Sequence, residues 1–189
     1  MWSCLVLASL LASGQSPPPA APAPAPALDP AWIGHWKGEL TIVGKDRPST
    51  VPMEIVIDPL TDRPGWQWTM IYGEGESKQV RDYALLPGAG PGRYVMDERN
   101  GILLDVSLAQ GALVAVFEVQ GTLLVSTEEL VGDTIQHRID AFATEGPRIS
   151  TAGGAEDKTT AVRSFRATGC QRAVLRRSGS DGPPPKDAK

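Results

Sequence analysis

The stretch AWIGHWKGELTIV, residues Ala31–Val43, decides the fold of this chain. From Gly34 onward its side chains alternate, with Trp36 and Leu40 on one side and mostly charged residues on the other. A period of two is typical of a β-strand that buries one face. The pattern therefore places Trp36 inside the protein and His35 on its outer surface.

The same alternation continues along the chain, and no segment shows a helical period. We expect further strands at residues 51–57, 65–73, 78–86, 93–97, 102–108, 112–119, 122–130 and 134–144, with a last one within 161–177. Asn100-Gly101 is typical of a tight hairpin turn. Closure into a barrel would remove the edges of such a meander. We therefore predict an all-β fold, an antiparallel up-and-down β-barrel of about eight to ten strands.

The chain divides into four parts by composition. Residues 1–14 read as a cleaved signal peptide, because an apolar run, Cys4 to Ala12, precedes small residues. That run is shorter than the roughly 20 apolar residues of a membrane-spanning helix. We therefore expect an exported protein, periplasmic or secreted, with no transmembrane segment in the mature chain. A retained membrane anchor is the alternative.

The other three parts are a spacer, a domain and a tail. Residues 15–30 hold seven of the 17 prolines, which predicts a stiff Pro/Ala-rich spacer. Residues 31–177 form the barrel domain, and residues 178–189 form a polar tail that we expect to be disordered. Cys170 is the one cysteine beyond the signal, so no internal disulfide is expected. Residues 145–160 read as a long polar loop, either a lid at the barrel mouth or a disordered insertion.

Gly34, His35 and Trp36 resemble the Gly-x-Trp motif on the first strand of lipocalins and the wider calycin group. This resemblance implies a lipocalin-like barrel in which the tryptophan closes one end and a late arginine packs across it. Arg166 and Arg172 are the candidates for that arginine. Residues 32–40 also resemble the start of nitrobindin-like haem barrels, but His137 does not match the position of that family's axial histidine.

The sequence lacks the motifs of several common catalytic and metal-binding sites. The sequence has no phosphate-binding glycine loop, no Gly-x-Ser-x-Gly elbow and no His-Glu-x-x-His or paired-cysteine metal site. Its two histidines, His35 and His137, fall on opposite faces by parity, so a metal pair is not expected. A net charge of −4 and an export signal disfavour nucleic-acid binding. We therefore name no catalytic residue, metal or cofactor.

The candidate ligand-binding residues are inward side chains of the predicted strands. They comprise aromatic walls and polar anchors: Trp36, Trp66, Trp68, Tyr72, Tyr83 and Phe117, with Arg81 and His137. Each has a structural alternative. The rings could simply fill the barrel, His137 could be a satisfied core histidine, and Arg81 could pair with a structural glutamate.

These observations leave three functions open. The first is an exported lipocalin-like barrel that binds a small hydrophobic or amphiphilic ligand in its interior and is not an enzyme. The second is a non-catalytic structural or protein-interaction module of the cell envelope, with a filled barrel and an envelope partner. The third is a barrel enzyme, such as a cyclase or isomerase, that uses inward carboxylates or Tyr83.

Overall fold

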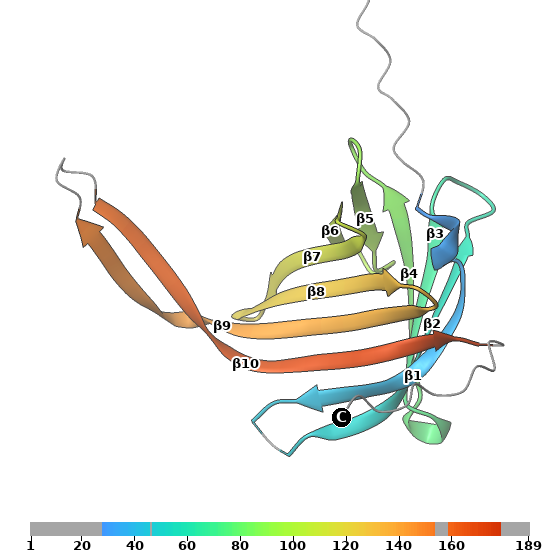
Figure 1. Cartoon of the computed structure of the whole chain (residues 1–189), viewed down its shortest axis with the longest axis horizontal. Coiled ribbons are helices and arrows are strands. Elements are labelled where there is room, and N and C mark those ends of the chain that lie inside the picture. The colour runs from blue at the N-terminus through green and yellow to red at the C-terminus, as the bar shows by residue number, and fades with distance from the viewer. Residues whose placement is uncertain (1–27, 46, 154–158, 179–189) are drawn as a thin grey trace, which may run out of the picture.

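Ten antiparallel strands close into a barrel in the computed structural model, which describes residues 28–45, 47–153 and 159–178 (Figure 1). The strands are β1 (Gly34–Val43), β2 (Ser49–Pro59), β3 (Trp66–Tyr72), β4 (Gln79–Pro87), β5 (Arg93–Asp97), β6 (Leu103–Ala109), β7 (Ala112–Val119), β8 (Thr122–Val131), β9 (Thr134–Gly153) and β10 (Thr159–Arg177). Each pairs with its neighbours in sequence, and β1 closes the barrel against β10. The predicted all-β antiparallel barrel is confirmed, with ten strands.

Turn chemistry supports this meander where strands reverse within a few residues. Between β5 and β6 the connection is residues 98–102, longer than the tight turn expected at Asn100-Gly101, and the positive φ values fall at Arg99 (57°) and Gly101 (96°). Gln110 (φ 51°) and Gln120 (φ 48°) also take positive φ values in the turns after β6 and β7, each followed by a glycine. Such tight reversals fit the right-handed twist of paired strands. The predicted bounds of β1, β5 and β7 match the structure residue for residue.

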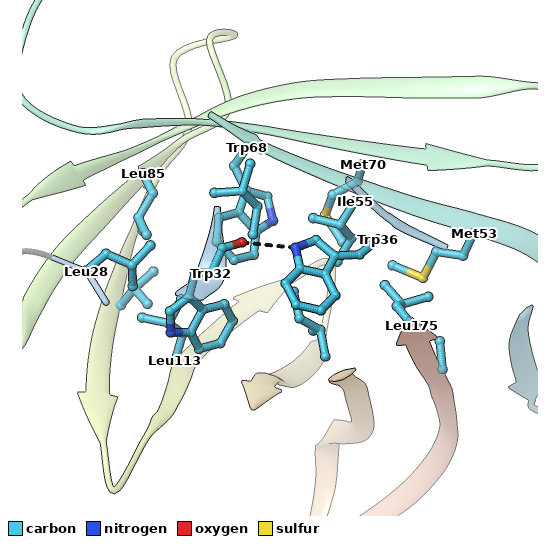
Figure 2. Close-up of a cluster of buried hydrophobic side chains, with 14 of the residues drawn as sticks. Leu28, Trp32, Trp36, Met53, Ile55, Trp68, Met70, Leu85, Leu113 and Leu175 are labelled. Carbon is cyan, nitrogen blue, oxygen red and sulfur yellow. Dashed lines mark hydrogen bonds between the residues drawn. The ribbon is translucent and has the colours of Figure 1, made fainter. Parts of the chain in front are cut away.

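One end of the barrel is closed by a plug of large apolar side chains. Figure 2 shows Trp32 and Trp36 packed beside Trp68 and Leu28. The plug begins in a short 3-10 helix, η1 (Pro30–Trp32), and the indole nitrogen of Trp36 donates to the carbonyl of Trp32 at 2.9 Å. Trp32 is only 2% exposed, so the segment before β1 seals this end.

An arginine packs across the plug, as the calycin resemblance implied, but it is neither Arg166 nor Arg172. The guanidinium carbon of Arg177, the last residue of β10, lies 4.1 Å from the centre of the Trp36 ring. Arg177 also donates to the carbonyls of Ile33 and Ala31. Both predicted candidates are exposed and lie farther back along β10. Strand pairing sets this outcome, because Trp36 pairs directly with Arg177.

The interpretation of residues 145–160 as a loop is wrong for its described part. Residues 145–153 continue β9 and residues 159–160 begin β10. Pairing of β9 with β8 ends at Ala143, and pairing of β10 with β1 ends at Cys170. Beyond these points β9 and β10 pair only with each other, as a two-stranded arm of residues 144–153 and 159–169 that extends away from the barrel (Figure 1).

Two register shifts mark the base of the arm. They lie between Ser164 and Arg166 and between Ala167 and Gly169. Bulges of this kind bend a strand and increase its local twist. Polar residues such as those of the arm read as a loop in a sequence, but in the structure β9 and β10 pair with each other along residues 148–153 and 159–164.

The predicted signal peptide, most of the spacer and most of the C-terminal tail lie outside the described residues. The last residues of the spacer do appear in the structure. Leu28 is 2% exposed and Pro30 begins η1, so both contribute to the closed end. Within the described ranges, no helix combines the length and the apolar character that a membrane crossing needs.

Candidate functional site

The barrel is hollow at the end opposite the plug. A cavity of about 770 Å³ opens there, at the end formed by the turns after β1, β3, β5 and β7. Its walls are mainly apolar, and its lining residues include Leu40, Ile42, Val51, Tyr72, Leu104, Phe117, Leu124 and Ile139. This volume lies within the range of small-molecule sites, about 300 to 1,000 Å³.

A narrower recess of about 90 Å³ continues the cavity toward the plug. The two spaces share Tyr72, Arg81, Leu104 and Phe117 among their lining residues. The recess is also bounded by Trp68, whose side chain belongs to the plug. The interior is therefore divided along its axis into a filled end, a recess and a wide mouth.

The predicted ligand-binding residues divide along the same axis. Tyr72, Arg81 and Phe117 line both spaces, and Trp68 and Tyr83 line the recess. Three others line neither space. Trp36 is fully buried in the plug, Trp66 packs edge-on against Tyr94 at 6.0 Å between ring centres, and His137 lies behind Glu128.

Arg81 points into the hollow part of the barrel from β4. Its guanidinium carbon lies 5.2 Å from the centre of the Tyr72 ring. Partial burial lowers the pKa of Arg81, but the neighbouring Tyr83 and Tyr72 and, to a smaller extent, the charge of Glu98 outweigh that effect, and the net shift is upward. The expected pair with a structural glutamate is not formed, since among the described residues no carboxylate makes an ion pair with Arg81.

Tyr72 contributes a phenol to the wall shared by the cavity and the recess. Burial raises its pKa from 10.0 to about 12, while Arg81 lowers it and Glu128 raises it. Its hydroxyl has a poor partner in the thioether of Met70, at 3.6 Å. A ligand oxygen or nitrogen would be a better partner for this hydroxyl.

His137 points inward, as predicted, and is paired as a core histidine. Its Nδ1 lies 3.0 Å from Oε1 of Glu128, across the β8–β9 pair. Ser126 donates a second hydrogen bond to the same oxygen at 3.0 Å. The imidazole is fully buried, and its Nε2 has no hydrogen-bond partner among the described residues.

His35 lies on the outer surface, as its parity indicated. Its Nε2 is 2.7 Å from Glu54, which also pairs with Lys37 at 3.0 Å. The two histidines therefore occupy opposite faces of the sheet. In the described ranges, no three or more His, Cys, Asp or Glu side chains gather in a way that could hold a metal ion.

Sequence reasoning did not single out seven further polar residues that line the cavity or its recess: Ser77, Gln79, Glu98, Glu118, Ser126, Glu128 and Gln171. The alternation of side chains along β8 could have identified two of these residues, Ser126 and Glu128. Leu124, Ser126, Glu128 and Leu130 share one parity, so two polar residues interrupt an otherwise apolar inner face. Parity alone is enough to identify Glu128 as an inward carboxylate.

Comparisons with known proteins support the fold. The structure resembles a crystal structure of a protein with unknown function from the DUF3598 family of Nostoc punctiforme, with a TM-score of 0.56 and 14% sequence identity. The match covers 80% of this chain and 50% of that chain, so the present chain spans about half the length of that protein.

A second resemblance is more distant. A mutant of the fluorescent protein UnaG matches with a TM-score of 0.40 and 11% identity, covering 78% of this chain and 96% of that one. No protein-family model matches the sequence, and no curated protein does. At these identities the likeness extends to the fold alone, that of an antiparallel barrel.

Proposed function

We propose that this protein is a lipocalin-like carrier or receptor that binds a small amphiphilic molecule inside its barrel. The observation that carries the proposal is the cavity of about 770 Å³, with apolar walls and a recess where polar groups converge. Binding sites for small molecules typically combine an apolar lining with a few polar groups that fix orientation. A barrel filled along its whole length, as the envelope-module hypothesis requires, would lack this space.

The closed end supplies the rigidity that a binding site needs. The closed end is filled by the side chains of Trp36, Trp68 and Leu28. At the open end, the side chains of Leu104 and Phe117 line the cavity. Strands closed into a ring hold both sets at fixed positions. The apolar part of a ligand would gain about 25 cal/mol for each Å² that leaves water.

A substitution that fills the cavity tests this function. Leu104→Trp places a large ring in the shared wall of cavity and recess. Leu103→Trp is the matched control, because Leu103 is the neighbouring residue and is 64% exposed. Binding of the neutral fluorescent probe N-phenyl-1-naphthylamine should fall at least about fivefold in the first variant and stay unchanged in the second. Equal probe binding by both variants, with thermal melts showing both folded, would exclude the interior site.

Export is part of the same proposal. The apolar run from Cys4 to Ala12 followed by Ala12-Ser13-Gly14 supports it. Expression of the full chain in a bacterial host, followed by intact-mass measurement of the periplasmic fraction, should show loss of about the first 14 residues. Recovery of the full-length chain in the cytoplasm would contradict export.

A second candidate function is suggested by the arm. Ile149 is 65% exposed there, Val162 50% and Phe165 37%, and the outer edges of both strands have no further strand beside them in the described structure. Such edges can accept a strand from a partner protein. Replacing residues 147–163 by Asn-Gly should abolish capture of that partner while leaving probe binding in the barrel intact. Unchanged capture would exclude the arm as the interaction site.

A further inference from the structure

Carboxylates outnumber guanidinium groups among the residues that line the recess. In the recess, two carboxylates, from Glu98 and Glu128, accompany one guanidinium, that of Arg81. His137 lies behind Glu128 and does not line the space. The interior is therefore electronegative, although its walls are mostly apolar.

The single guanidinium is already engaged by protein groups. The guanidinium carbon of Arg81 lies 5.2 Å from the centre of the Tyr72 ring. Partial burial lowers the pKa of Arg81, but Tyr83, Tyr72 and, to a smaller extent, Glu98 raise it by more. A ligand carboxylate at this point would be a third anion beside Glu98 and Glu128.

Glu128 is placed to accept a donor from a ligand. Its side chain is 12% exposed and lines the recess. Ser126 and His137 both bond to Oε1, so Oε2 can accept a further hydrogen bond. The buried Nε2 of His137, which has no partner in the described residues, is a second polar atom in the same cluster.

Aromatic rings surround the same recess. Trp68, Tyr72, Tyr83 and Phe117 all line it. The faces of such rings attract cations, most strongly where water is excluded. Carboxylates together with ring faces form a recognised setting for an ammonium group, and a desolvated anion would be repelled by both.

We propose that the ligand is a cationic amphiphile, whose ammonium head lies in the recess near Glu98 and Glu128 and whose apolar body fills the wide cavity. This inference rests on the proposed binding function and specifies the chemistry of the ligand. It distinguishes the site from one built for a fatty acid anion, which would use Arg81 as its anchor.

Three probes with the same tail and different heads test the charge preference. Dodecylamine, dodecanol and dodecanoate are compared as competitors of N-phenyl-1-naphthylamine on the full chain, below their micelle concentrations and at about 0.15 M salt to screen surface charge. We expect dodecylamine to compete at least about tenfold better than dodecanoate, with dodecanol between them. Glu128→Gln should reduce that ratio to about threefold or less. Glu129→Gln, an exposed neighbour on the same strand, should leave it unchanged.

The outcomes separate the two proposals. If dodecanol competes and dodecanoate equals or exceeds dodecylamine, the cationic preference is overturned and the binding function stands. If none of the three competes, both fail. An equal loss of preference in Glu128→Gln and Glu129→Gln would attribute it to overall charge and overturn the inference. Should Glu128→Gln not fold, as judged by its thermal melt, Glu98→Gln provides the same test from the other side of the recess.

Discussion

Arg177 and Trp36 join the last and first strands of the barrel, with the guanidinium carbon 4.1 Å from the ring centre. The same side chain donates to the carbonyls of Ile33 and Ala31, in the segment that carries Trp32 into the plug. One residue thus fastens the barrel seam and the plug together.

Arg177→Ala should lower the free energy of unfolding by about 2 kcal/mol, because a cation–π contact and charge-assisted hydrogen bonds are lost together. Arg176→Ala is the control, since Arg176 is the preceding residue and is exposed. It should cost less than about 0.5 kcal/mol. Urea unfolding followed by tryptophan fluorescence measures both, and equal midpoints would contradict the fastening role.

Gly38 allows the close approach of β1 and β10. A Cβ at this position would collide with the carbonyl oxygen of Val174. Gly38→Ala should therefore destabilise the barrel by about 2 kcal/mol, through a forced shift of the seam. Gly44→Ala is the matched control, because a Cβ there would have no atom within 4 Å, and its thermal midpoint should stay near that of the parent. A neutral Gly38→Ala would show that the seam can widen freely.

The two histidine–glutamate pairs allow the effect of burial on the coupling free energy to be measured within one protein. His137 and Glu128 are 0% and 12% exposed, whereas His35 and Glu54 are 39% and 29% exposed. Double-mutant cycles with glutamine should give a coupling of about 1 to 3 kcal/mol for the inner pair. For the outer pair the coupling free energy should stay below about 1 kcal/mol, although the two side chains are closer together, because water screens their interaction. A larger coupling in the outer pair would contradict this account.

Tyr72 should make the barrel sensitive to alkali. Burial raises its pKa from 10.0 to about 12, so an unfolded chain releases this phenolic proton before the folded one does. The free energy of unfolding should therefore hold below pH 10 and fall as the pH rises toward about 12, by about 2 to 3 kcal/mol.

Phenolate absorbance of the folded protein measures this proton directly, and Tyr72→Phe assigns it. The variant should lose a component that titrates near pH 12 and should have a shallower alkaline loss of stability. If the component that disappears titrates near pH 10, Tyr72 is not shielded from water as the structure indicates.

Much of the barrel could be predicted because its strands alternate cleanly and its turns carry recognisable residues. Gly34–Val43, Arg93–Asp97 and Ala112–Val119 were predicted with their observed bounds. Side-chain parity also placed His35 outside and His137 inside, with Arg81 and Tyr72 facing the interior. These properties depend on residues close together in the sequence.

What escaped prediction depends on register between distant segments. Arg177 meets Trp36 because β1 and β10 pair in one particular register, which their sequences do not encode locally. The arm escaped because its polar residues lack the alternation that a buried face imposes. The separation of Trp36, in the plug, from Phe117, at the cavity, depends on how far each lies along the barrel axis, which parity cannot give.

The location of the plug gives the barrel a direction for attachment. Leu28 is buried in the closed end, and Ser178, just after β10, donates to the carbonyl of His35 at the same end. The described chain thus enters and leaves on the side opposite the mouth. A linker or solid support joined through either terminus would therefore attach at the closed end and leave the mouth of the cavity unobstructed.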